Sequence, residues 1–258
     1  MNDAPATASA PIKADAFLGG ALLLRQPVKG HRAGTDAVLL AAAAPAVFSG
    51  AALDLGAGAG AAGLALALHR PGLRIGLVEN DPRVAALARE NLALNHLSDR
   101  GAVFEADLLS PRARRDAGLS DASAGLVITN PPFYDPGKAR MSPDPARRAA
   151  HAMLLTGPAG LAAWIAASLA LVEPDGTMIL IHRPDALPAI LDALGGRAGA
   201  IAVLPVHPRA AKEAVRILVR CKKGSRAPMS LAPALILHEG TSFTERAAAV
   251  HRGALIDW

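Results

Sequence analysis

The sequence has little cysteine and no apolar run long enough for a membrane. Cys221 is the only cysteine among 258 residues, so an internal disulfide is excluded and a cysteine-based metal site is not expected. The cytoplasm is the natural compartment for such a chain. The longest apolar helical run, residues 161–172, is far shorter than the roughly 20 residues that a membrane span requires. Residues 1–14 lack the pattern of a secretory signal and are expected to form a disordered tail.

Aromatic residues are also scarce, at 3% of the chain, so the core is expected to consist of Leu, Val, Ile and Ala. The formal net charge is +5 and the isoelectric point is about 9.9. This basic balance favours a polyanionic partner, although a solvated charged surface would give the same balance. Cations gather in a basic loop (Arg112, Arg114, Arg115), in the long connection 134–157 (Lys138, Arg140, Arg147, Arg148) and beside two late strands (Arg209, Lys212, Lys222, Lys223).

Short apolar segments alternate with helical ones along the chain. This alternation predicts a doubly wound α/β sheet in a single domain, residues 15–258. Thr35 or Asp36 is expected to cap the first helix. The expected strands are mostly parallel, and a late pair, 200–206 and 213–221, is expected to be antiparallel. The other strands are predicted over residues 51–55, 74–79, 102–107, 125–129 and 177–182.

A glycine-rich turn, Gly56-Ala-Gly-Ala-Gly60, follows the first of these strands and precedes a helix. Missing side chains at such a turn let a nucleoside ligand approach the backbone and the helix N-terminus. The spacing of Gly58, Gly60 and Gly63 also satisfies the dinucleotide fingerprint, so these glycines alone do not separate an NAD enzyme from another nucleoside binder. Glu79, at the end of the next strand, is placed to accept hydrogen bonds from ribose hydroxyls.

The segment Asn130-Pro-Pro-Phe133 ends the fourth strand. An Asn amide oxygen and a neighbouring carbonyl are two acceptors, which suit one planar NH2 group. Accepting both its hydrogens favours the pyramidal state in which the nitrogen lone pair can attack, and Phe133 offers a face for a flat base. The alternative is an ordinary turn, because Asn and Pro commonly end strands. Asp107, after the third strand, either accepts from an adenine amine or caps the segment that follows.

The ordered set of Asp54-x-Gly-x-Gly-x-Gly60, Glu79, Asp107 and Asn130-Pro-Pro-Phe133 resembles the class I S-adenosylmethionine methyltransferases that modify a planar nitrogen. Within that group, residues 28–40 and the Asn-Pro-Pro segment are similar to bacterial adenine-N6 methyltransferases that act on valine tRNA. The resemblance covers roughly residues 15–255. It implies a seven-stranded Rossmann-like fold, S-adenosyl-L-methionine as cofactor and an adenine in a tRNA anticodon loop as substrate.

The resemblance also implies roles for individual residues. The target base would be held by Asn130, Pro131, Pro132 and Phe133, and phosphates by Lys138, Arg140, Arg147 and Arg148. The cofactor would be held by Thr35, Asp54, Gly56, Ala57, Gly58, Gly60, Glu79, Asn80, Asp107, Leu108 and Asn130. No metal and no membrane partner is expected, and the oligomeric state stays open.

Three other functions remain compatible with the sequence. An enzyme that methylates the side-chain amide of glutamine in a protein needs the same two-hydrogen geometry. A small-molecule methyltransferase would need the cofactor site but not the basic excess. An RNA-binding protein without catalytic activity would need the basic residues but not the set formed by Asp54, Glu79 and Asp107.

Overall fold

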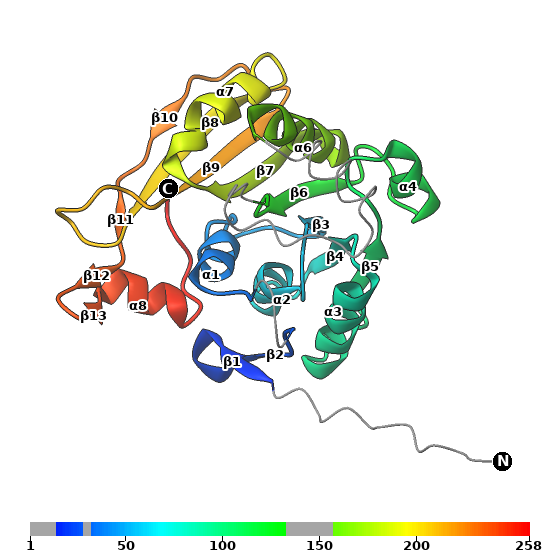
Figure 1. Cartoon of the computed structure of the whole chain (residues 1–258), viewed down its shortest axis with the longest axis horizontal. Coiled ribbons are helices and arrows are strands. Elements are labelled where there is room, and N and C mark those ends of the chain that lie inside the picture. The colour runs from blue at the N-terminus through cyan, green and yellow to red at the C-terminus, as the bar shows by residue number, and fades with distance from the viewer. Residues whose placement is uncertain (1–13, 28–31, 133–156) are drawn as a thin grey trace.

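The chain folds into three layers, with helices on both faces of one central sheet (Figure 1). This computed structural model describes residues 14–27, 32–132 and 157–258. Helices α1 (Thr35–Ala42), α2 (Ala61–Leu68), α3 (Pro82–Leu94) and α8 (Glu245–His251) cover one face, and α6 (Gly157–Leu171) and α7 (Leu187–Leu194) cover the other. Each face carries its own cluster of buried apolar side chains, so the sheet separates two cores.

Within the described residues the central sheet has nine strands in the order β10-β8-β9-β7-β6-β3-β4-β5, with β11 also paired to β8. The predicted number of seven is therefore wrong by two. Seven strands have five residues or more, while β10 and β11 have two residues each and extend the edge strand β8. The bounds are β3 (Gly50–Leu55), β4 (Leu73–Glu79), β5 (Gly101–Glu105), β6 (Ala124–Thr129), β7 (Val172–His182), β8 (Ala198–His207), β9 (Arg216–Lys223), β10 (Ser230–Leu231) and β11 (Leu235–Ile236).

The strand directions confirm the predicted mixed sheet. Strands β3 to β7 are parallel, and β9 is antiparallel to both β7 and β8. The central strands have apolar runs without alternation, for example Leu126, Val127 and Ile128 in β6, which are all fully buried. Such runs are typical of parallel strands that are covered on both faces.

Side chains cap the N-termini of three helices. Asp81 accepts from the backbone N–H of Arg83 at the start of α3, Ser110 caps α4 (Pro111–Asp116), and Thr244 caps α8. The expectation that Thr35 or Asp36 caps α1 is wrong, because Gly34 occupies the cap position and no side chain accepts there. Asp36 instead binds Arg216 of β9, with 2.9 Å between Oδ2 and Nε.

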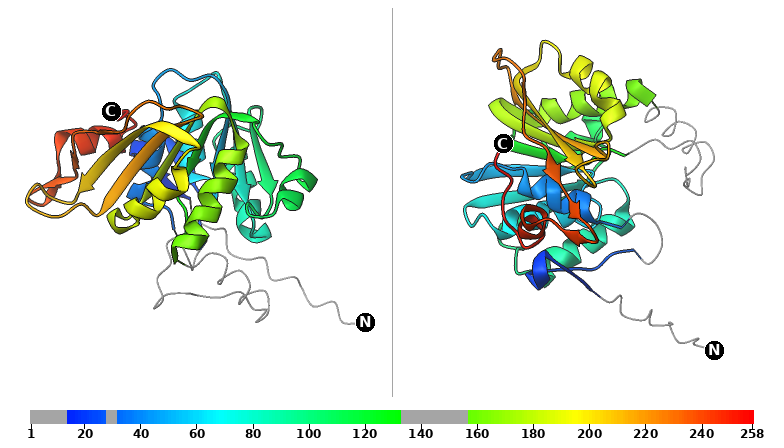
Figure 2. Two further views of the ribbon diagram at one scale, coloured as in Figure 1. Left: turned by 90° about the horizontal axis from the view of Figure 1, so that it is seen from above. Right: turned by 90° about the vertical axis from the view of Figure 1, so that its left-hand side faces the viewer.

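A hairpin of β1 (Asp15–Phe17) and β2 (Leu22–Leu24), joined by the short helix η1 (Leu18–Gly20), precedes the sheet and was not predicted. It lies outside the helix layer of α1 and α2, as the right-hand view of Figure 2 shows. Asn91 of α3, which is fully buried, binds the backbone of Arg25 after β2 and donates to the carbonyl of Ala59 at 2.9 Å. Asn91 thus connects the hairpin to the glycine-rich turn.

The predicted basic loop around residue 114 is a helix, α4, because Ser110 and Pro111 provide a cap and a first residue suited to one. The Arg114 side chain is only 7% exposed and donates to the carbonyl of Leu108 at 2.6 Å. Arg114 therefore stabilises the packing of α4 and is not available to phosphates. No helix in the described part of the chain is long and apolar enough to cross a membrane.

Candidate cofactor and methyl-transfer site

The predicted site residues gather at one edge of the sheet. Because β3, β4, β5 and β6 are parallel, their carboxyl ends lie together, which is where open α/β sheets bind ligands. Leu55 of β3 lies opposite Val78 on one side and Thr129 on the other. The glycine-rich turn, Glu79 and Asn130 are therefore neighbours although they are far apart in the sequence.

The glycine-rich turn depends on backbone angles that other residues rarely adopt. Gly56, Gly58 and Gly60 have φ values of 70°, 58° and 92°. A Cβ at Gly56 would lie 3.0 Å from Trp164 of α6, and one at Gly60 would lie 2.8 Å from Leu77. Larger residues would thus strain the turn and push into the packed side chains beneath it.

Glu79 organises the backbone around this turn. One carboxylate oxygen accepts from the N–H of Gly58 at 2.9 Å, and the other accepts from the N–H groups of Asn80 and Asp81, each at 2.9 Å. The carboxylate is thereby fixed at the end of β4 and next to the turn. Of the roughly four lone-pair sites of a carboxylate, one remains, on the oxygen that binds Gly58, for a hydroxyl group of a ligand.

Asp54 lies beneath the turn, and only 2% of the residue is exposed. Its Oδ2 accepts from the N–H of Gly63 in the first turn of α2 at 2.8 Å. Burial raises the pKa of Asp54 to about 7, the Gly63 hydrogen bond opposes this rise, and the Glu79 charge adds to it. Asp54 therefore connects the end of β3 to the start of α2 from inside the protein.

The end of β6 is held by a small network. Thr129 is fully buried, donates from Oγ1 to the carbonyl of Leu55 at 2.8 Å and accepts from Trp164 Nε1 at 3.0 Å. The next residue, Asn130, has a buried Oδ1 that accepts no hydrogen bond within the part of the chain that the structure describes. A buried acceptor without a donor is costly, and this makes Asn130 Oδ1 a candidate to accept a hydrogen bond from a ligand.

Comparison with known proteins agrees with this geometry. A family model described as methyltransferase small domain matches residues 32–159. The tRNA1(Val) (adenine(37)-N6)-methyltransferase of Aeromonas hydrophila is 32% identical over 196 residues, which cover 75% of this chain and 77% of that protein. The enzyme of the same name from Porphyromonas gingivalis is 31% identical over 222 residues, or 82% of this chain and 83% of its own.

A solved structure from Agrobacterium tumefaciens, described as a predicted O-methyltransferase, is 34% identical, with a TM-score of 0.71. It covers 86% of this chain, and this chain covers 98% of it. The chain belongs to the family described as methyltransferase small domain. S-adenosylmethionine is thus the cofactor of this methyltransferase, and it supplies a methyl group on a positively charged sulfur.

The residues of the methyltransferase fit that cofactor. At Gly58 nothing lies within 4 Å of the place where a Cβ would stand, so the turn is open at this point, as a ligand close to the backbone requires. Glu79 supplies carboxylate oxygens at the same strand edge, and Asn130 an acceptor without a donor. These residues would hold the nucleoside and the acceptor group, whereas Asp54 would stabilise the turn from below.

The other predicted residues are partly brought to this edge. Ala57 belongs to the turn, Asn80 follows Glu79, and Asp107 lies two residues beyond β5, where it accepts from the N–H of Leu109 at 2.9 Å. Asp107 therefore caps the short segment that follows β5, which agrees with one of its two predicted roles, while Ser110 caps α4. Leu108 is buried in the core.

Thr35 begins α1 beside a separate cavity. Pro131 is buried and Pro132 exposed. Several predicted residues lie outside the described residues: Phe133, Lys138, Arg140, Arg147 and Arg148.

The cations beside the late strands do not lie together. Arg209 and Lys212 are in the connection between β8 and β9, which is at the same edge as Asn130. Lys222 and Lys223 end β9, which runs antiparallel, so they lie toward the opposite end of the sheet. Lys223 also donates to the carbonyl of Val172 at 2.6 Å. All four residues flank the late strands, as expected, but only Arg209 and Lys212 lie at the edge of Asn130.

Sequence reasoning missed the network of Thr129 and Trp164. The sequence offers little indication of this network, because Trp164 lies in a helix rich in Ala and Leu, where a tryptophan is expected to be a core residue. Only the packing of α6 under the turn brings its indole N–H to β6.

Proposed function

We propose that this methyltransferase transfers a methyl group from S-adenosylmethionine to the exocyclic N6 amine of an adenine in tRNA, in the anticodon loop. The relatives from Aeromonas hydrophila and Porphyromonas gingivalis carry this activity in their names. The observation that carries the proposal is the buried, unpaired Oδ1 of Asn130 at the cofactor edge. This oxygen needs a hydrogen-bond donor, and the flat NH2 group of adenine provides one.

In this mechanism Asn130 acts on the amine rather than on the base as a whole. The lone pair of an adenine amine is delocalised into the ring, which makes the nitrogen a poor nucleophile. Acceptance of its hydrogens by Asn130 Oδ1 and a neighbouring backbone carbonyl favours the pyramidal amine, in which the lone pair is localised. Thr129, through Leu55 and Trp164, holds the strand end so that the acceptor is already in position.

Exposed cations at the same edge support an RNA substrate. Arg183 follows β7, while Arg209 and Lys212 lie between β8 and β9. Arg209 is held by two hydrogen bonds to the carbonyl of Gly240, at 3.2 and 3.3 Å. Such side chains would contact phosphates and orient a stem, and an anticodon-loop base is accessible without opening a duplex.

The direct test uses labelled S-adenosylmethionine with separate pools of tRNA and protein from cells that lack this enzyme. Label in tRNA, recovered after digestion as N6-methyladenosine, is expected. Methylation of the glutamine amide in a protein is the second candidate, because the same Oδ1 would accept from that NH2 group. Label in protein but not in RNA would support the second candidate and reject the first.

We further propose that residues 15–258 act as one methyltransferase domain in the cytoplasm. The β1–β2 hairpin is bound to α3 through Asn91 and Asn95, so it is part of the same packed unit. The cytoplasm follows from the proposed substrate, because tRNA is modified where it is made and used. A truncation that begins at residue 15 should keep the methyltransferase activity of the full chain.

A further inference from the structure

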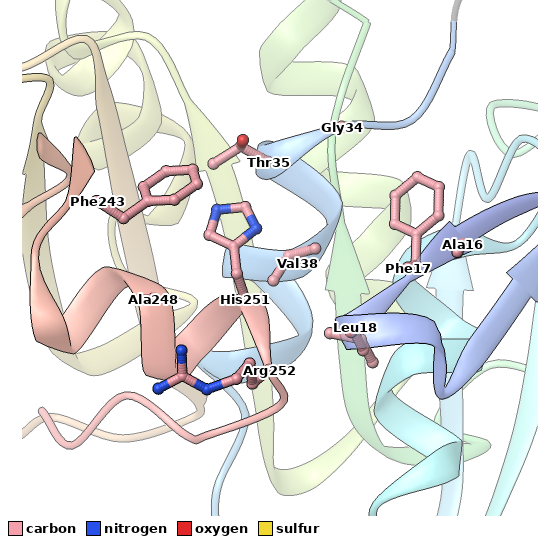
Figure 3. Close-up of a pocket in the computed structure, with 11 residues that line it drawn as sticks. Ala16, Phe17, Leu18, Gly34, Thr35, Val38, Phe243, Ala248, His251 and Arg252 are labelled. Carbon is pink, nitrogen blue, oxygen red and sulfur yellow. The ribbon is translucent and has the colours of Figure 1, made fainter. Parts of the chain in front are cut away.

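A cavity of about 460 Å³ lies apart from the glycine-rich turn, between the first hairpin, the start of α1 and α8 (Figure 3). Its volume is in the range of pockets that bind small molecules. Apolar walls come from Phe17, Val38 and Phe243, and polar groups from Thr35, His251 and Arg252. A few polar groups in an apolar enclosure suit a flat heterocycle with a polar edge.

One wall of this cavity contains two stacked rings, Phe243 and His251, and a third ring, His238, stacks on Phe243 without lining the cavity. Phe243, at the end of β13 (Ser242–Phe243), lies 4.7 Å from the ring of His238 and 4.4 Å from the ring of His251, with interplanar angles of 21° and 28°. Phe243 is 41% exposed. In Figure 3 Phe17 lies on the other side of the cavity from the pair of Phe243 and His251. The space between them is thus bordered by rings on two sides.

His251 has hydrogen-bonding capacity that the described protein does not use. Its Nε2 is buried without a partner, and in Figure 3 its other ring nitrogen is turned toward the side of Phe17. Burial, followed by the charge of His238, lowers the pKa of His251, so the ring is neutral at pH 7. A neutral imidazole both donates and accepts, as the edge of a base requires.

The cavity is close to the methyl-transfer edge. Thr35 in its wall is followed by Asp36, which binds Arg216 at the start of β9. That end of β9 lies beside the end of β7, where Ile217 is opposite His182. Strand β7 is next to β6, which ends at Thr129, just before Asn130. The ends of β6 and β9 are two strand spacings apart, or about 10 Å. The cavity wall at Thr35 therefore lies at the same edge of the sheet as Asn130, as one polymer that contacts both would require.

We propose that this cavity is a second nucleotide subsite, which receives a nucleotide of the RNA substrate other than the methylated one. Its base lies between Phe17 and the stacked pair of Phe243 and His251, where it hydrogen-bonds with His251, and its phosphate lies at Arg252. Base stacking on aromatic side chains tolerates any base, so this subsite holds the strand and does not select its sequence. The assignment rests on the proposed RNA substrate.

The test compares Phe243→Ala with Phe243→Tyr, which keeps a ring, in the full chain. For Phe243→Ala we expect the KM for tRNA to rise about tenfold or more, with kcat and the cofactor Kd unchanged. Phe243→Tyr should be near the parent. Arg252→Ala should raise KM, whereas Arg226→Ala, an exposed arginine beyond the far end of β9, is the matched control and should not. Thermal unfolding of each variant reports whether the fold is kept.

A second measurement does not depend on methylation. Adenosine and cytidine monophosphate are titrated against the cofactor-bound protein, and bound nucleotide is detected by saturation-transfer NMR. The subsite is supported if the nucleotide signals are lost in Phe243→Ala and retained in Phe243→Tyr. This result would support it even if the parent methylates no RNA and the proposed function fails. A parent that methylates tRNA, with variants of unchanged KM and unchanged nucleotide signals, would overturn the subsite and leave the proposed function intact.

Discussion

At the scale of single residues, the site depends on groups whose environment differs from that of ordinary surface side chains. Glu79 uses both carboxylate oxygens to hold backbone N–H groups, and Asp54 is buried below them. Asn130 carries an acceptor that the described protein leaves unused. The sequence pointed to all three residues because each stands at or near a strand end. It could not show that Asp54 supports the turn from inside, since burial depends on packing by distant segments.

Replacing Glu79 with Ala should weaken S-adenosylmethionine binding by about 1–3 kcal/mol, because the ribose contact and the order of the turn are both lost. Glu105, which lies opposite Glu79 on β5 and pairs with Arg89 on the surface, is the matched control. Calorimetry on Glu79→Ala and Glu105→Ala checks this. Equal cofactor affinity in both variants would show that Glu79 does not bind the cofactor. Binding of NADH in place of S-adenosylmethionine would overturn the cofactor assignment.

Asp54 should make stability depend on pH. Its pKa in the folded protein, about 7, is above the ordinary value of 3.8, so between these values the folded state keeps a proton that the unfolded chain has lost. The free energy of unfolding should therefore fall as the pH rises from about 4 to about 7, by at most about 1.4 kcal/mol per pH unit. Urea unfolding of the parent and of Asp54→Asn checks this. The difference between the two should depend on pH in this window, and a constant difference would contradict the burial of an ionisable Asp54.

At the scale of elements, the junction of β3, β6 and α6 controls the position of Asn130. Thr129→Val removes the donor to Leu55 and the acceptor of Trp164, and both groups lie in the interior. We expect a loss of about 1–3 kcal/mol in the free energy of unfolding and a lower kcat. Trp164→Phe removes the indole N–H and also part of a buried ring beneath the turn, so it should lower both quantities as well. Urea unfolding and steady-state kinetics measure them, and a Thr129→Val enzyme with parental kcat would show that the network does not position Asn130.

The elements that the sequence predicted well are those with local signals. Glycine turns, strand-ending prolines and apolar runs placed β3, β4, β6, β8 and β9 within a few residues. The β1–β2 hairpin was missed because its strands have three residues each and are held by Asn91 and Asn95 from a helix some 66 to 72 positions later. The aromatic cavity was missed for the same reason, since Phe17, Val38 and Phe243 meet only in the folded chain.

At the scale of the whole molecule, the net charge of +5 is less informative than where the cations lie. Arg209 and Lys212 are at the methyl-transfer edge, whereas Lys222 and Lys223 are toward the other end of β9. Binding of tRNA should weaken with salt by roughly 0.7–0.9 log units per log unit of salt for each phosphate contacted. Reversal of Arg209 and Lys212 to Glu should reduce this slope, and reversal of Lys222 should not. Filter binding at several salt concentrations measures the slopes, and equal slopes in all variants would place the RNA elsewhere.

The central claim is that Asn130 activates the N6 amine of a tRNA adenine, and the most direct test is single-turnover methylation by Asn130→Ala. The enzyme is saturated with S-adenosylmethionine, mixed with tRNA that lacks the modification, and N6-methyladenosine is quantified by mass spectrometry over time. The account predicts that the methyl-transfer rate falls by two orders of magnitude or more, as when a placed group that stabilises the transition state is removed. It also predicts cofactor and tRNA affinities near those of the parent. A variant that forms N6-methyladenosine at the parental rate would contradict the account.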